Sequence, residues 1–128
     1  MSLATWKKKY YPVEASKVSK RDALAHSIRK WRGLYPSVLK QHGLERTENY
    51  ISKMHDHNMM FIDDESCALC HHFIDDTCMA CPLAIARGGM PCDHMNARES
   101  RSPYGKWIDT GDSRMMLRWL RKAEKVKS

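Results

Sequence analysis

The chain has 128 residues, of which 42% are hydrophobic and 29% are charged, and it carries a formal net charge of +7. This length fits one domain with a modest core. No run of apolar residues approaches the roughly 18 that a membrane-spanning helix needs, so no membrane partner is expected. The sequence shows no glycine-rich phosphate loop, no Ser/His/Asp arrangement and no internal repeat. These absences favour a protein without enzyme activity and give no sign of a small-molecule substrate.

Charge is unevenly distributed along the chain. Residues 1–55 carry 12 Lys and Arg against 4 acidic residues, residues 56–81 carry 6 acidic residues and no Lys or Arg, and residues 82–128 carry 10 Lys and Arg against 5 acidic residues. The two basic segments, residues 1–55 and 82–128, have the potential to bind phosphates, whereas the acidic segment between them would repel nucleic acid. The first residues also lack the apolar segment of a signal peptide, so a cytoplasmic protein is expected.

Residues 1–18 are predicted to form a basic, aromatic arm in an extended conformation, followed by one domain over residues 19–128. Trp6, Tyr10 and Tyr11 interleave with three lysines in this arm. Such rings can stack on bases while the lysines contact phosphates. Alternatively, the rings pack the arm against the domain, and this second interpretation is favoured.

The first main helix is predicted over Ser19–Arg32. Ser19 and Asp22 are spaced like a capping box, and Gly33 is suited to end the helix. The face assignments follow from helical periodicity: Leu24, Ile28 and Trp31 share the apolar face, and Arg29 and Arg32 lie away from it.

A short helix is expected next over Pro36–Gln41, because proline suits the first helical turn. The following segment allows two interpretations, a helix over residues 48–57 capped by Thr47 or a short strand over residues 59–62. The strand is favoured, paired with residues 71–74 across the cysteine segment to give a short β-hairpin.

Residues 65–94 contain all five cysteines, in the spacing C-x2-C-x7-C-x2-C-x10-C. Two CxxC pairs can supply the four thiolates of a tetrahedral structural zinc site, because each tight turn directs both sulfurs at one ion. One structural Zn2+ is therefore predicted, and its candidate ligands are Cys67, Cys70, Cys78, Cys81 and Cys92. Only four ligands are needed, so Cys92 can replace one of the second pair, most readily Cys78. Further substitutes are His71, His72 and His94.

Three alternatives to zinc stay open for these cysteines. Disulfides are disfavoured by the odd number of cysteines and by the lack of any sign of secretion. An iron–sulfur cluster is disfavoured by a spacing that matches neither ferredoxin pattern, and buried free cysteines are the third alternative. Pro82, which follows Cys81, is expected to open a short helix through Arg87 that Gly88 and Gly89 end.

The same part of the chain is rich in imidazoles and carboxylates. They are His55, Asp56, His57, Asp63, Asp64, Glu65, His71, His72, Asp75 and Asp76. Such a group can hold a second, catalytic ion, which would make the protein a metal-dependent nuclease. No known ligand motif is present, and acidic loops are usually solvated, so this is the weaker interpretation.

The C-terminal part is predicted to contain a turn over Pro103–Ile108, anchored by Tyr104 and Trp107, and a helix over residues 112–125 with Asp112 as its N-cap. The apolar residues of this helix share one face: Met116, Leu117, Leu120 and Ala123. A stripe of cations at i, i+4, i+7 and i+11 lies on the other face: Arg114, Arg118, Arg121 and Lys125. This stripe is the best candidate for a surface that contacts nucleic acid or a partner, and a merely solvated helix face is the alternative.

Five short segments carry a resemblance to known proteins: HSIRKWRGL (His26–Leu34), ESCALC (Glu65–Cys70), CMACPLA (Cys78–Ala84), GGMPC and SPYGKW (Ser102–Trp107). Together they resemble a group of small, mostly uncharacterised bacteriophage proteins, over most of the chain. The resemblance implies a phage or prophage origin and a metal knuckle. For a phage-encoded protein, the expected cytoplasm is that of the host. It implies no enzyme activity and no catalytic residue.

Together these observations predict an α fold with minor β, a small single domain of two main helices around a zinc knuckle with a short β-hairpin. The predicted function is that of a non-enzymatic, zinc-binding accessory protein. It would contact nucleic acid without sequence specificity, or a nucleic-acid-handling complex, through its basic surfaces. An alternative is a protein–protein inhibitor of a host factor, which would use the acidic surfaces and the nine methionines of the chain.

Overall fold

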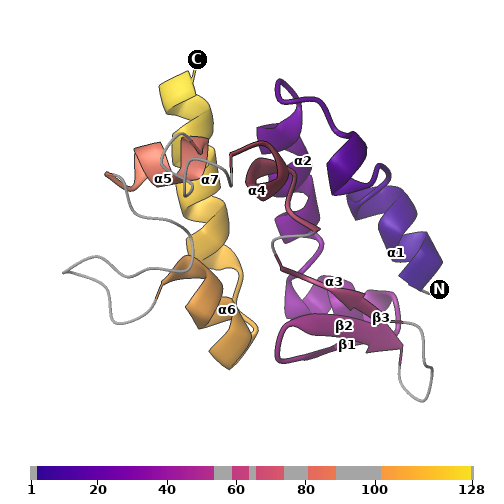
Figure 1. Ribbon diagram of the computed structural model, residues 1–128. Helices are drawn as coiled ribbons and strands as arrows, with labels where there is room; N and C mark the ends of the chain where they lie inside the picture. The colour runs from indigo at the N-terminus through magenta and orange to yellow at the C-terminus, as the bar shows by residue number, and fades with distance from the viewer. Residues whose placement is uncertain (1–2, 54–58, 64–65, 74–80, 89–101, 128) are drawn as a thin grey trace.

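The computed structural model describes residues 3–53, 59–63, 66–73, 81–88 and 102–127 (Figure 1). Within these ranges the chain forms seven α-helices, one short 3-10 helix and one three-stranded antiparallel sheet in the order β1-β2-β3. The expected small domain of mainly helical structure with minor β is thereby confirmed.

The two main helices are α2 (Ala23–Arg32) and α7 (Arg114–Lys127), and they pack against each other. Figure 1 shows α2 between α7 and the first helix of the chain. The start of α2 differs from the prediction, because Ser19 and Asp22 form a turn before the helix. There the Asp22 backbone N–H donates to the Ser19 carbonyl at 3.1 Å, and the two side chains are hydrogen-bonded at 3.0 Å.

The prediction of an extended N-terminal arm is wrong, since α1 covers Leu3–Tyr10. Leu3 and Trp6 lie one turn apart and are both buried, which gives this short lysine-rich helix an apolar face. The Trp6 ring is fully buried, and its Nε1–H donates to the Gly33 carbonyl at 2.8 Å. The favoured interpretation, in which the rings of this segment pack against the domain, is therefore confirmed. A 3-10 turn, η1 (Ala15–Lys17), leads from α1 towards α2.

Helix α3 (Pro36–Gln41) forms as predicted and leads into the sheet of β1 (Leu44–Thr47), β2 (Tyr50–Lys53) and β3 (Met59–Phe61). The predicted strand at residues 59–62 is confirmed, but its predicted partner is wrong. Strand β3 pairs with β2, placing Tyr50 opposite Phe61 and Ile51 opposite Met60.

Of the predicted partner strand over residues 71–74, residues 71–73 belong to helix α4 (Ala68–Phe73), and residue 74 lies outside the described residues. Leu69 and Phe73 are four residues apart and both buried, so this segment has the apolar spacing of a helix. Helix α4 packs against α2, which brings the first CxxC pair close to the main helix.

Helix α5 (Pro82–Ala86) has its proline at the start, as predicted, and packs against α7. The turn predicted at residues 103–108 is a helix instead, α6 (Pro103–Thr110). Ser102 caps it by accepting the Gly105 backbone N–H at 2.9 Å, and Gly111 ends it with a φ of 78°.

The aromatic part of the core joins these elements. Trp107 of α6 is fully buried and meets Trp31 of α2 edge-on, with ring centroids 5.3 Å apart. The Tyr104 hydroxyl donates to the Ile62 carbonyl after β3. Arg46 of β1 donates to the Ile108 carbonyl near the end of α6 at 2.7 Å. The predicted anchoring role of Tyr104 and Trp107 is confirmed, although the segment is helical.

Gly33→Ala is expected to destabilise the protein by about 1–3 kcal/mol, because the added methyl group would overpack the contact with α1. A Cβ at Gly33 would lie 2.7 Å from the Tyr10 Cβ. The backbone there is right-handed, with φ −76°, so steric overlap is the only penalty. Denaturant unfolding measures the difference. Gly43→Ala is the comparison, because its Cβ meets nothing within 4 Å and only its φ of +68° carries a cost, about 1 kcal/mol. A neutral or stabilising Gly33→Ala would contradict the packing of α1 on α2.

Candidate metal centre and basic surface

The first CxxC pair is brought together at the start of α4. Cys67 directly precedes this helix and Cys70 lies in its first turn. The Cys70 backbone N–H donates to the Cys67 sulfur at 3.4 Å. A backbone N–H directed at sulfur stabilises the thiolate, which is the form that binds metal.

Helix α2 supplies two polar side chains to this pair. The Lys30 side chain is 1% exposed, and its ammonium donates to the carbonyl of Ser66, the residue before Cys67, at 3.0 Å. Ser27, one turn earlier, places its hydroxyl 4.0 Å from the Cys67 sulfur. Sequence reasoning missed both residues. The signal was helical spacing, because Ser27 lies four residues before Trp31 and Lys30 lies three residues after Ser27, which places both on the buried side of the helix.

A buried ammonium is costly unless an anion or several acceptors surround it. In the part of the chain that the structure describes, no carboxylate pairs with Lys30, and Cys67 is the nearby group that can be anionic. The pKa of the Cys67 thiol is held well below its usual value by a hydrogen bond with the Cys70 side chain. The Lys30 ammonium contributes to the same effect, which outweighs burial. The site therefore favours a thiolate at Cys67.

The remaining candidate ligands are only partly within the described ranges. Cys81 is buried and directly precedes Pro82 at the start of α5, while Cys78, Cys92 and His94 lie outside the described residues. Across residues 3–53, 59–63, 66–73, 81–88 and 102–127, no three His, Cys, Asp or Glu side chains are grouped to hold a metal ion. The structure thus brings Cys67 and Cys70 together and leaves the full zinc ligand set a prediction. A thiolate pair fits one half of a tetrahedral zinc site.

The two histidines after Cys70 differ in their surroundings. His72 is half-buried, and its Nε2 lies 2.6 Å from the Val18 carbonyl, so this nitrogen donates and only Nδ1 is left for a ligand role. His71 is exposed, with its ring edge-on to His72. Of the ten residues considered for a second ion, the structure describes Asp63, His71 and His72, so the second-ion interpretation lies mainly outside the described residues.

The cationic stripe is on the exposed face of α7, as predicted. The exposed members are Arg114, Arg118, Arg121 and Lys125, whereas Met116, Leu117, Leu120 and Ala123 are buried. Trp119 lies between α7 and α5, with the Arg87 guanidinium 5.8 Å and the Lys122 ammonium 4.9 Å from its ring centroid. The cations and the buried apolar residues therefore lie on opposite faces of α7, as the helical periodicity of the sequence predicts.

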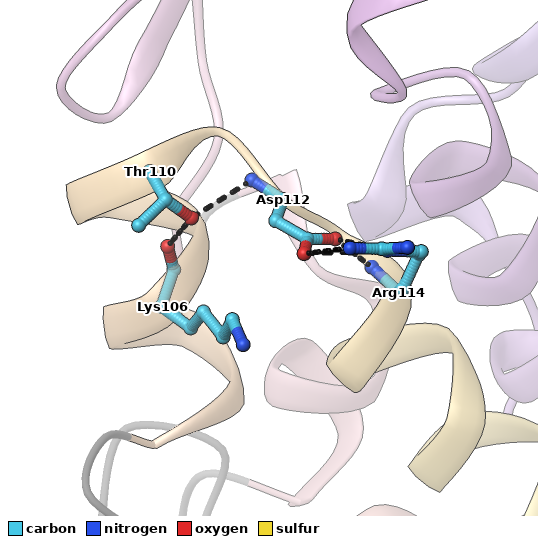
Figure 2. Close-up of polar contacts among 4 residues, drawn as sticks. All are labelled: Lys106, Thr110, Asp112 and Arg114. Atoms are coloured by element: carbon cyan, nitrogen blue, oxygen red, sulfur yellow. Dashed lines mark hydrogen bonds and ion pairs between the residues drawn. The ribbon is translucent and has the colours of Figure 1, made fainter.

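Arg114, the first cation of the stripe, is paired with Asp112 (Figure 2). Its Nε and Nη2 donate to the two carboxylate oxygens at 3.0 and 2.9 Å. Asp112 also accepts the Arg114 backbone N–H at 3.0 Å, and its own backbone N–H donates to Thr110 at 3.2 Å. The helix begins at Arg114, so Asp112 caps it from two residues before its start instead of from the N-cap position.

No protein-family profile, curated protein or solved structure matches this chain. None of the helices in the described ranges has the length and apolar content required to cross a membrane.

Arg114→Gln is expected to return the pKa of Asp112 from about 2 towards its usual value of 3.8, because hydrogen bonds from Arg114 are the largest cause of the shift. The folded pKa is lowered, so this pair stabilises the fold above pH 4 or so, and the contribution disappears as pH falls through about 2. Because Arg114 is exposed, solvent screening should keep this contribution to the free energy of unfolding small. NMR titration of the Asp112 carboxyl carbon measures both values. An unchanged Asp112 pKa in the variant would contradict the pairing.

Proposed function

We propose that this protein is a zinc-stabilised, non-enzymatic binding module that contacts nucleic acid, or a nucleic-acid-handling complex, through the basic face of α7. The observation that carries the proposal is the exposure of all four stripe cations on one face, opposite the buried residues of the helix. The cations follow the helix axis at one-turn intervals, which suits a row of phosphates. The resemblance to small bacteriophage proteins is consistent with an accessory role in a host cell.

Binding of this kind would be electrostatic and largely independent of sequence. Each phosphate that meets a Lys or Arg releases condensed counterions, so affinity falls as salt rises. The acidic segment over residues 56–81 would turn a polyanion away from the cysteine-rich part of the chain. The zinc centre would then stabilise the fold and take no part in contacting phosphates.

The proposed zinc ion would be held by Cys67 and Cys70 together with two of Cys78, Cys81 and Cys92. Support comes from the paired CxxC spacing and from the Cys67 thiolate environment beside Lys30. When bound, the ion would supply a structural cross-link. The chain's own residues position the first pair, because Lys30 fixes the Ser66 carbonyl and the Cys70 N–H contacts the Cys67 sulfur.

A second candidate function is protein–protein inhibition, and the outer face of the sheet favours it. Met59 and Phe61 of β3 are 46% and 49% exposed, and the Phe61 ring lies 5.6 Å from that of Tyr50 on β2. Exposed apolar side chains grouped on one sheet face are typical of partner-binding surfaces. Binding of nucleic acid separates the two functions, and divalent-ion-dependent cleavage during the same assay would instead indicate a nuclease.

We expect one tightly bound zinc per chain, measured by elemental analysis of freshly purified protein. Cys67→Ser or Cys70→Ser should abolish metal retention and cooperative unfolding, because structural zinc sites contribute folding energy directly. Cys78→Ser and Cys92→Ser should differ from each other, since only four ligands are needed. Iron with visible absorbance, or no metal, would overturn the zinc assignment.

Lys30→Met is expected to release zinc to a competing chelator more readily than the wild type, because partners outside the ligand sphere typically change metal affinity by about 10- to 100-fold. Lys40→Met is the matched control, since Lys40 is exposed on α3. Equal zinc retention in the two variants would show that the buried ammonium does not support the metal centre.

The binding constant for nucleic acid is expected to fall with salt, and the steepness of log K against log salt concentration measures the number of phosphate contacts. Replacing both Arg118 and Arg121 with Gln should reduce the magnitude of this slope by roughly 1.5, at about 0.7–0.9 per phosphate contact. Arg114→Gln should have a smaller effect because Asp112 already pairs with this side chain, and Asp112→Asn should raise affinity. Titrations of labelled DNA and RNA at several salt concentrations measure the slopes. The charge-matched control replaces the exposed Lys17 and Lys40 with Gln. A slope in the Arg118/Arg121 variant no lower than in the control would exclude α7 as the contact surface.

A further inference from the structure

A cavity of about 460 Å³ that is open to solvent lies where α1, α2 and α7 meet, apart from the cysteine pair. Residues from all three helices line it, among them Lys9, Tyr10, Ile28, Arg29, Arg32 and Glu124. Its volume is within the range of about 300–1,000 Å³ that small-ligand sites occupy. The lining combines three cations, one carboxylate and an apolar portion, which restricts the ligands that fit.

The cationic part of the cavity suits a phosphate group. Arg29 and Arg32 are exposed and lie three residues apart on α2, so their guanidinium groups project from neighbouring positions of one helix. The Arg29 Nε donates to the Lys9 carbonyl, which fixes the direction of this side chain. Among the described residues, the terminal nitrogens of Arg29 have no hydrogen-bond partner. Such nitrogens bind phosphate oxygens in pairs.

The apolar part of the cavity suits a flat ring. Tyr10 is half-buried, and its ring is held by two other aromatic side chains, with centroid distances of 5.8 Å to Trp6 and 6.0 Å to His42. Ile28 is also half-buried and adds aliphatic surface from α2. A fixed aromatic ring beside cations is the arrangement that binds an unstacked base and its phosphate.

We propose that this cavity binds a single nucleotide unit, with its phosphate on Arg29 and Arg32 and its base against Tyr10 and Ile28. The inference rests partly on the proposed function, because Glu124, which borders the cavity, belongs to α7, the helix that carries the stripe. A single strand bound along α7 would then place one nucleotide in the cavity. A base in a duplex is stacked and paired, so the cavity would contribute to the binding of single strands and not to the binding of duplexes.

The deciding variant is Ala25→Trp, because Ala25 is an exposed residue of the cavity wall and the larger ring fills the space without removing a charge. Its partner variant, Arg29→Gln with Arg32→Gln, removes the phosphate contacts. The control replaces Lys17 and Lys40 with Gln, which removes the same charge from exposed positions outside the cavity lining. Each full-length protein is titrated with a labelled single-stranded oligonucleotide, its duplex, adenosine monophosphate, inorganic phosphate and polyglutamate.

Ala25→Trp is expected to weaken single-strand binding on the order of 10-fold, the effect of losing one base-stacking contact, while duplex binding stays at the wild-type level. Both cavity variants should lose binding of adenosine monophosphate, which the control should retain. Wild-type single-strand affinity in Ala25→Trp, together with no binding of adenosine monophosphate to the wild type, would overturn the proposal.

Two further outcomes separate this inference from the proposed function. Binding of adenosine monophosphate that Ala25→Trp abolishes, without binding of either oligonucleotide, would support the cavity as a site for a free nucleotide while the α7 proposal fails. Equal displacement of the nucleotide by polyglutamate would overturn the nucleotide assignment and indicate an acidic peptide. Binding of inorganic phosphate as tight as that of the nucleotide would overturn the role given to Tyr10 and Ile28.

Discussion

The buried ammonium of Lys30 is the interaction on which the arrangement of this domain depends. It donates to the Ser66 carbonyl, so the chain entering α4 is fixed to the last turn of α2. The next residue of α2, Trp31, packs against Trp107 of α6, and Gly33 at the end of the helix accepts the Trp6 hydrogen bond from α1. One helix of ten residues therefore positions the first cysteine pair, the aromatic core and the N-terminal helix.

The proposed zinc ion would complete this arrangement by linking the two main helices. The first cysteine pair lies on α4, which packs against α2, while Cys81 directly precedes α5, which packs against α7. Helix α5 is attached to α7 by its buried residues Leu83 and Ala84 and by the Arg87 guanidinium over the Trp119 ring. A metal bound by both pairs would join two helices of only six and five residues, and small domains commonly compensate for a modest core with such a metal.

Periodicity allowed the main helices to be predicted, because their apolar residues recur every three or four positions over several turns. Periodicity failed for α1, because Leu3 and Trp6 are one apolar pair in a helix rich in lysine. It also failed to identify the partner of β3, because the pairing of β3 with β2, in which Tyr50 lies opposite Phe61, is a tertiary contact. The exposed placement of the α7 stripe followed from the same periodicity. Lys30 has the spacing of a buried position, but lysine is almost always exposed, so its residue type argued against burial. The cavity depends on how three helices meet, which no pattern within one helix contains.

The α7 stripe is not uniform, and this limits how it can bind a polyanion. Asp112 neutralises much of Arg114 at the start of the helix, and Glu124 lies beside Lys125 near its end. The strongest positive potential is therefore expected over Arg118 and Arg121, a span of one turn that reaches only two or so phosphates. Two such contacts alone give weak, salt-sensitive binding. A strand bound along α7 would gain further phosphate contacts from Arg29 and Arg32 on the adjacent helix α2, which would add to the few contacts that α7 itself provides.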